Sequence, residues 1–256
     1  MNDVEPKDVI AQRLDKEMAG LGVTEWTPRQ KLALAARILG TEGHWRGLAG
    51  QITCKVDDRG AMLTLGFGVG FDEAVASTLS LVDKSLAPLE GPMPNPGVRF
   101  HAWIYAKRPD LRAIVHTHPP ATAALAMTGE PLVVAHMDAT PLHDDCAFLP
   151  EWPGLPIGDD EGVIISRAMG DKHAILLANH GLLTAAATIE EATLLAVWME
   201  HAADMQLRAR AVGPIKPIKP ELAAESRDFL RKPKVVALTF GNFARRELRR
   251  DPSVIL

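Results

Sequence analysis

Three histidines in two short motifs are the residues of this chain best suited to metal chemistry. His116 and His118 stand two apart at the end of an apolar β-type run, and His180 lies between Asn179 and Gly181 after a second apolar run. Side chains at positions i and i+2 of a strand point to the same side, so His116 and His118 are expected to project together. Three imidazole ligands leave coordination positions open, as in catalytic metal sites. We therefore predict a catalytic divalent-metal site at these histidines.

The type of ligand indicates which metal to expect. Imidazole nitrogens suit zinc, with manganese, iron, cobalt and nickel as alternatives. A lone His-x-His pair is usually exposed or hydrogen-bonded elsewhere, so the first motif alone would be weak support for a metal. The second motif, at the end of another buried-strand pattern, is what favours a metal site. A divalent metal, preferably zinc, is the expected cofactor.

The elements that must position these histidines follow from hydrophobic pattern and proline placement. Apolar runs within residues 113–118 and 174–183 predict the two strands that present the histidines. Residues 98–107 are expected to form a helix before the first of these strands. The pair Pro119-Pro120 should begin another helix directly after His118, since proline is favoured at the first helical position.

The region before the first motif has clear start and stop signals. Thr27 and Gln30, on either side of an early proline, form a capping box for a helix that should stop at Gly40. Short strands are expected at about residues 51–56 and 61–65, separated by an Asp-Asp-Arg-Gly turn. These elements favour a mixed α/β domain.

The region after the first motif completes the expected organisation. Residues 132–136 have the pattern of another buried strand, and Thr188 with Glu191 forms a second capping box before a long apolar helix. We predict one domain over residues 1–212. Residues 213–256 are expected to form a proline-containing linker and a helical tail, packed on the same domain or on a neighbouring subunit.

Several of these segments resemble one protein family. Residues 108–118 (Arg-Pro-Asp-Leu-Arg-Ala-Ile-Val-His-Thr-His) and 176–183 (Leu-Leu-Ala-Asn-His-Gly-Leu-Leu), with the helix opened by Thr188-Ile-Glu-Glu-Ala, are similar to motifs of the class II aldolase/adducin family. The resemblance extends from about Thr27 to Arg210. It implies an α/β fold, a three-layer α/β/α sandwich with a central, mainly antiparallel sheet.

The resemblance also implies site residues and assembly. It assigns His116, His118 and His180 as the three zinc ligands. Family members usually form tetramers with the site near a subunit boundary, so a homo-oligomer, a tetramer by analogy, is expected.

Two departures from the sugar-phosphate enzymes of that family bear on function. Those enzymes have a proton-transfer glutamate four residues before a helix histidine, which is His101 here, and this chain has Gly97 at that position. Their phosphate loops are rich in Ser, Thr and Gly, whereas this chain has Pro94 and Pro96. Proline lacks the N–H group with which such loops hold phosphate. An unphosphorylated substrate is therefore expected.

The predicted activity is cleavage of a carbon–carbon bond, for which a divalent metal would act as a Lewis acid. Decarboxylation of a small hydroxylated, preferably aromatic, carboxylate is slightly favoured over aldol cleavage of a hydroxy-oxo acid, because decarboxylation needs no base to remove a hydroxyl proton. The alternative is a non-catalytic interaction module of the adducin type. Retention of all three histidines favours the enzyme.

Five further residues are candidates for the site. His101 and Tyr105 are four apart on one helix face and are predicted to transfer protons near the metal, with structural hydrogen bonds as the competing interpretation. Arg99 could pair with a substrate carboxylate through two hydrogen bonds, although a surface arginine is the commoner case. His44 and His143 are predicted to line the substrate pocket; His143 lies in a His-Asp-Asp segment that resembles adducin-like relatives.

Composition limits the remaining possibilities. The chain has 256 residues, 23% charged and 47% hydrophobic, which fits one sizeable globular domain. A net charge of −4 gives no footprint for nucleic acid, and two cysteines form no disulfide framework. No apolar run reaches membrane length. We expect a cytoplasmic protein with a small-molecule substrate and neither a nucleic-acid nor a membrane partner.

Overall fold

A single sheet organises residues 5–44, 47–155 and 158–256, which the computed structural model describes. Its strand order is β4-β3-β2-β1-β5-β8-β7-β6, and every neighbouring pair is antiparallel except β6 and β7. The strands are β1 (Gln51–Lys55), β2 (Met62–Thr64), β3 (Ser80–Val82), β4 (Pro88–Glu90), β5 (Ala113–Thr117), β6 (Cys146–Leu149), β7 (Ala174–Leu177) and β8 (Gly181–Ala186). His116 lies in β5 and His180 between β7 and β8, and these three strands are consecutive in this order.

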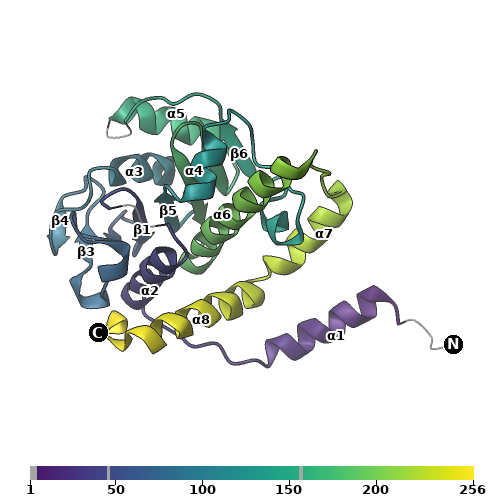
Figure 1. The fold of residues 1–256 in the computed structure, drawn as a ribbon. Helices are drawn as coiled ribbons and strands as arrows, with labels where there is room; N and C mark the ends of the chain where they lie inside the picture. The colour runs from purple at the N-terminus through teal and green to yellow at the C-terminus, as the bar shows by residue number, and fades with distance from the viewer. Residues whose placement is uncertain (1–4, 45–46, 156–157) are drawn as a thin grey trace.

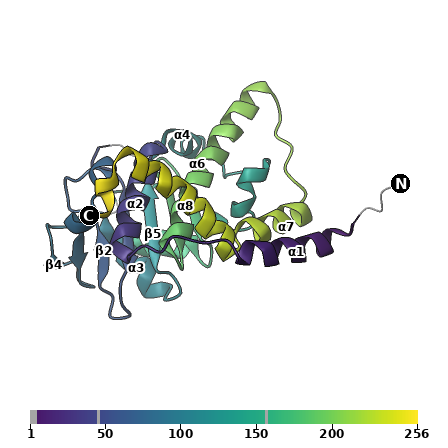
Figure 2. The same ribbon diagram turned by 90° about the horizontal axis from the view of Figure 1, so that it is seen from below.

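Helices cover both faces of the sheet (Figures 1 and 2). One face packs against α2 (Pro28–Thr41), α4 (Pro120–Ala126) and α6 (Ile189–Val212), and the other against α3 (Val98–Lys107) and α5 (Asp159–Met169). Successive side chains of β5 point to opposite faces of the sheet. Val115 packs in the core on the side of α2 and α6, and Ile114 packs in the core on the side of α3 and α5. The predicted α/β/α sandwich with a mainly antiparallel sheet is confirmed.

Local capping explains where the two long helices of one layer begin. The Gln30 backbone N–H donates to Thr27 Oγ1, and the Thr27 N–H donates to the Gln30 side chain, as the capping box predicted. In the second predicted capping box, at Thr188 and Glu191, only one of the two hydrogen bonds forms. The Glu191 N–H donates to Thr188 Oγ1, but the Glu191 carboxylate pairs with Arg231 instead.

The strand predicted at residues 132–136 is wrong, because this segment joins no sheet. Its polar groups are paired by other parts of the chain. The Gln206 side chain accepts from the Val133 N–H and donates to the Pro131 carbonyl, and the Val134 carbonyl accepts from the Ile218 N–H. A side chain and the linker before α7 thus replace a neighbouring strand.

The C-terminal segment returns to the main body. Its helices are α7 (Pro220–Leu230) and α8 (Pro233–Arg250), and α8 packs against α2 and α6 with Phe240 fully buried. Between the two helices, Arg231 pairs with Asp145 and Glu191. None of the described helices is long and apolar enough to span a bilayer.

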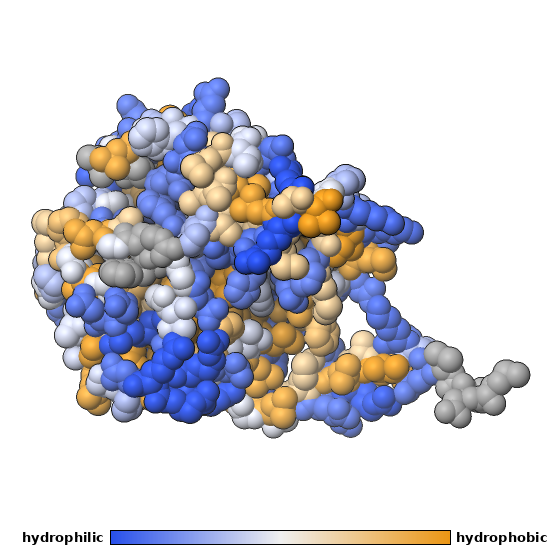
Figure 3. Space-filling view, viewed as in Figure 1, coloured by the Kyte–Doolittle hydropathy of each residue, from blue (hydrophilic) through white to orange (hydrophobic). Residues whose placement is uncertain are grey.

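The N-terminal helix α1 (Lys7–Ala19) has no buried residue and lies beside α7 and α8, away from the sheet (Figures 1 and 2). Apolar side chains on this arm are open to solvent, as the orange atoms at lower right of Figure 3 show. Val9 and Leu14 are 44% and 39% exposed. The arm is held mainly by surface ion pairs.

Candidate metal centre

The three predicted ligands come from two neighbouring strands of the sheet. His116 lies in β5, and His118 follows that strand by one residue. His180 occupies the tight turn between β7 and β8, where Asn179 has a left-handed φ of 56° and the His180 N–H donates to the Leu177 carbonyl. Because β5 pairs with β8, the turn and the end of β5 are brought side by side.

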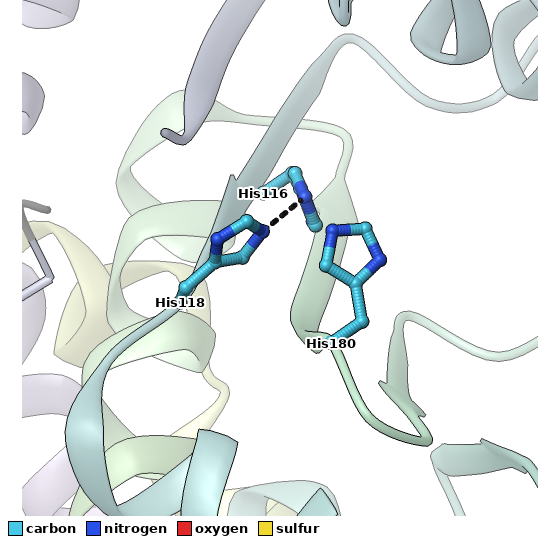
Figure 4. Close-up of side chains that lie close together, drawn as sticks. All are labelled: His116, His118 and His180. Carbon is cyan, nitrogen blue, oxygen red and sulfur yellow. Dashed lines mark hydrogen bonds between the residues drawn. The ribbon is translucent and has the colours of Figure 1, made fainter. Parts of the chain in front are cut away.

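The three imidazole rings converge on one point (Figure 4). Their ligand nitrogens all lie within 4.8 Å of one another, and the Nε2 atoms of His116 and His118 are 3.0 Å apart. Two nitrogens bound tetrahedrally to zinc at their usual bond length would be roughly 3.3 Å apart. His116 Nδ1 donates to the Leu182 carbonyl, 2.8 Å away, which leaves the Nε2 lone pair directed at the cluster. The donor set and its geometry therefore fit a divalent metal.

Burial keeps these imidazoles neutral. It lowers the pKa of His116 well below 6.5, with further contributions from His180 and His118. Burial also lowers the pKa of His118, and burial together with His118 lowers the pKa of His180 to about 4. A neutral imidazole offers a lone pair to a metal at neutral pH, whereas a protonated one cannot.

A cleft of about 260 Å³ opens onto the histidines. Its other described walls are mainly apolar: Leu48, Ala49, Phe67, Pro96 and Leu155, with Gln51, Asn95 and Gly97 between them. Those described side chains include no carboxylate, lysine or arginine. A small, partly apolar molecule suits this cleft better than a highly charged one.

Gln51 is a cleft residue that the sequence did not reveal. It pairs directly with His116 across β1 and β5, so both side chains lie on the same face of the sheet. Its Oε1 is buried without a hydrogen-bond partner among the described residues. A Cβ built on Gly97 would lie only 2.7 Å from Gln51 Nε2. Gly97 therefore leaves space that the Gln51 amide occupies.

His44 lies behind the metal histidines. It is fully buried, and its Nδ1 is 2.9 Å from Oγ1 of Thr117, the residue between His116 and His118. Thr117 points to the opposite face of β5 from His116. His44 is therefore next to the strand end that presents the ligands, but it does not belong to the described lining of the cleft.

His101 and Tyr105 form a separate buried group with Thr53. Thr53 Oγ1 lies 2.9 Å from both His101 Nδ1 and the Tyr105 hydroxyl. Burial lowers the pKa of His101 to about 3 and raises the pKa of Tyr105 well above 10. Neither side chain belongs to the described lining of the cleft, although Thr53 lies on the same face of the sheet as Gln51 and His116. The placement favours the structural interpretation, and a proton-transfer role stays a prediction.

Arg99 and His143 also lie apart from the histidine cluster. Arg99 makes an exposed two-point ion pair with Asp159. His143 ends a 3-10 turn, and its carbonyl accepts from Arg227 of α7. Neither belongs to the described lining of the cleft, so this arrangement does not support their predicted role in substrate binding.

Comparison with known proteins gives one family. A family model described as the class II aldolase and adducin N-terminal domain matches residues 30–207. The 3,4-dihydroxyphthalate decarboxylase of Arthrobacter keyseri is 29% identical over 208 residues, which span 73% of this chain and 83% of that protein. Alpha-adducin of Mus musculus is 29% identical over 223 residues, which span 84% of this chain but 29% of adducin.

Solved structures agree in fold. The L-fuculose 1-phosphate aldolase from Glaciozyma antarctica PI12 superposes with a TM-score of 0.81 at 26% identity, covering 88% of this chain and 90% of that one. An aldolase II superfamily protein from Pseudomonas syringae has a TM-score of 0.81 at 25% identity, covering 93% and 99% respectively.

Proposed function

Since the chain belongs to the class II aldolase and adducin N-terminal domain family, we propose that it is a divalent-metal-dependent carbon–carbon lyase. Its substrate would be a small, unphosphorylated hydroxy-carboxylate. The observation that supports this most is the convergence of three neutral imidazoles at an otherwise apolar cleft. Zinc is the preferred ion, with manganese, iron, cobalt and nickel as alternatives.

The residues of the cleft have distinct tasks in this proposal. His116, His118 and His180 would hold the ion and leave positions open for substrate oxygens. A divalent ion there would supply a Lewis acid that stabilises negative charge on a substrate oxygen as the carbon–carbon bond breaks. Leu48, Phe67 and Leu155 would pack against the substrate and exclude water.

Decarboxylation is slightly favoured over aldol cleavage. An aldolase needs a base for the substrate hydroxyl, and the described cleft lining contains no carboxylate for that task. Apolar walls also disfavour a carboxylate more than the neutral carbon dioxide that leaves. The similarity to 3,4-dihydroxyphthalate decarboxylase points the same way.

A non-catalytic interaction module is the alternative, because alpha-adducin is similar over most of this chain. By family analogy we also expect a homo-oligomer, a tetramer. The cysteine usage of the sequence favours a location in the cytoplasm. The metal is the feature that separates the two functional candidates.

The first test is the metal content of the purified protein beside the double variant His116→Ala, His118→Ala. The wild type is expected to hold about one divalent ion per chain and the variant almost none, because one imidazole cannot retain the ion. His143→Ala serves as the control and should keep the full metal content, since His143 lies outside the cluster.

Activity follows from that result. The metal-loaded wild type would be offered 3,4-dihydroxyphthalate and related hydroxy-carboxylates, with carbon dioxide and aldehyde release as readouts. A wild type that takes up no metal, even when zinc is added, would contradict the lyase and favour the adducin-like module.

A further inference from the structure

The short helix α4 connects both ligand segments. Its first residue follows His118 after a single proline, Pro119. At its other end, the Ala126 carbonyl accepts a 3.0 Å hydrogen bond from the Asn179 N–H, directly before His180. The position of this helix therefore bears on the placement of His118 and of His180 together.

The N-terminus of α4 lacks a cap of its own. The capping position is Pro119, whose extended backbone (φ −71°, ψ 155°) suits a cap but whose ring has no acceptor. The backbone N–H groups of Ala121 and Thr122 would remain unpaired in the protein interior. Such unpaired buried donors destabilise a fold, so another part of the chain must satisfy them.

Glu200, far away in sequence on α6, supplies the missing acceptor. Its Oε1 accepts from the Ala121 N–H at 2.8 Å, and its Oε2 accepts from the Thr122 N–H and hydroxyl at 2.7 Å each. Glu200 is only 8% exposed. A carboxylate has only acceptors, so it matches three donors without conflict, and its charge suits a helix N-terminus.

We propose that Glu200 is a positioning residue for the metal centre. By fixing the start of α4 against α6, it holds His118 at the end of β5, and through the Ala126–Asn179 hydrogen bond it holds the turn that presents His180. This inference rests on the proposed metal site. A positioning role differs from a purely structural one in what substitution of Glu200 should do. It predicts that the affinity for the metal falls, beyond any loss of stability.

The variant Glu200→Gln tests the proposal. Glutamine keeps the size of the side chain but replaces one of the two acceptor oxygens with an NH2 donor, so at least one of the three donors loses its partner. The dissociation constant for zinc, measured by competition with a chromophoric chelator, is expected to rise about tenfold or more. The cobalt-loaded variant should show altered visible absorption.

Gln206→Glu is the matched control, since it makes the reverse exchange six residues further along α6. Gln206 is 4% exposed and bonds to Val133 and Pro131, a segment without metal ligands. The control should lose stability yet keep its zinc dissociation constant within about twofold of the wild type. A second change, Pro119→Ser in the Glu200→Gln background, should restore affinity by supplying a local cap.

Thr122→Val, which removes one hydrogen bond to Glu200, provides the test should Glu200→Gln not fold. It is expected to raise the zinc dissociation constant about threefold. Zinc binding as tight in the folded Glu200 or Thr122 variant as in wild type would overturn the proposal and leave the lyase function intact. A wild type without zinc affinity would overturn the proposed function itself, and this inference with it.

Discussion

Burial of individual imidazoles determines how this site can act. His116, His118 and His180 are poor bases in the folded chain because their charged forms would lose hydration. That property suits metal ligands, which must be deprotonated, and makes them poor proton donors at neutral pH. His101 shares the burial, but its partner is Thr53.

His101 gives a pH-dependent stability that can be measured. Its pKa falls from 6.5 to about 3 on folding because of burial. Between those values the unfolded chain binds a proton that the folded chain does not, so stability is lost as the pH falls. The free energy of unfolding of the metal-free protein can be measured in urea between about pH 6 and about pH 4. As the pH falls, it should decrease less in His101→Gln than in the wild type, by up to about 1.4 kcal/mol per pH unit.

The comparison isolates one residue, since the metal histidines titrate in both proteins. If the free energy of unfolding of wild type and His101→Gln depended equally on pH, His101 would be hydrated in the folded chain. That result would favour its predicted role in proton transfer.

Elements meet closely at the metal centre, and two glycines show how closely. A Cβ on Gly181, the first residue of β8, would lie against the Thr117 carbonyl and 2.8 Å from His118 Cδ2. The Thr117 backbone and the His118 ring cannot easily move aside to make room for this added carbon. A Cβ on Gly97, at the start of α3, would meet the end of the flexible Gln51 side chain instead.

The two alanine variants should therefore behave differently. Gly181→Ala is expected to lose about 2 kcal/mol or more in stability and also to weaken zinc binding, because the β5–β8 approach must widen. Gly97→Ala should lose less than about 1 kcal/mol and keep zinc, because the Gln51 amide can rotate away. Thermal unfolding and chelator competition check both, and the reverse ranking would contradict the described packing.

The two terminal segments relate to the whole molecule in opposite ways. α8 buries Phe240, Val236 and Ala244 within the larger core, whereas α1 has no buried residue. Surface ion pairs such as Lys232 with Asp15 contribute little to stability. Apolar packing thus attaches residues 213–256 firmly to the main body. The N-terminal helix α1 is attached only weakly.

Truncation tests this difference. Removal of residues 213–256 should abolish cooperative unfolding, because it uncovers the apolar surface beneath α8. Removal of residues 1–22 should change the free energy of unfolding by less than about 1 kcal/mol. Cooperative unfolding of the variant that lacks residues 213–256 would instead support residues 1–212 as an independent domain. The tail would then be free to pack on a neighbouring subunit.

Local patterns were enough to predict several features of this protein. The helix at residues 98–107, the cap at Thr27 and the strands around the histidines depend on neighbours a few residues apart, and they were confirmed. The spacing of His116 and His118 already placed both on one face of a strand. The family motifs then supplied the sheet architecture.

Tertiary packing alone decided the rest. The β1–β5 register brings Gln51 beside His116, and α6 presents Glu200 to a helix that lacks its own cap. Packing of α3 against the sheet turned His101 toward Thr53 rather than toward the cleft. Each contact joins residues distant in sequence. Its geometry depends on register and on how helices pack on the sheet, and no local pattern encodes these.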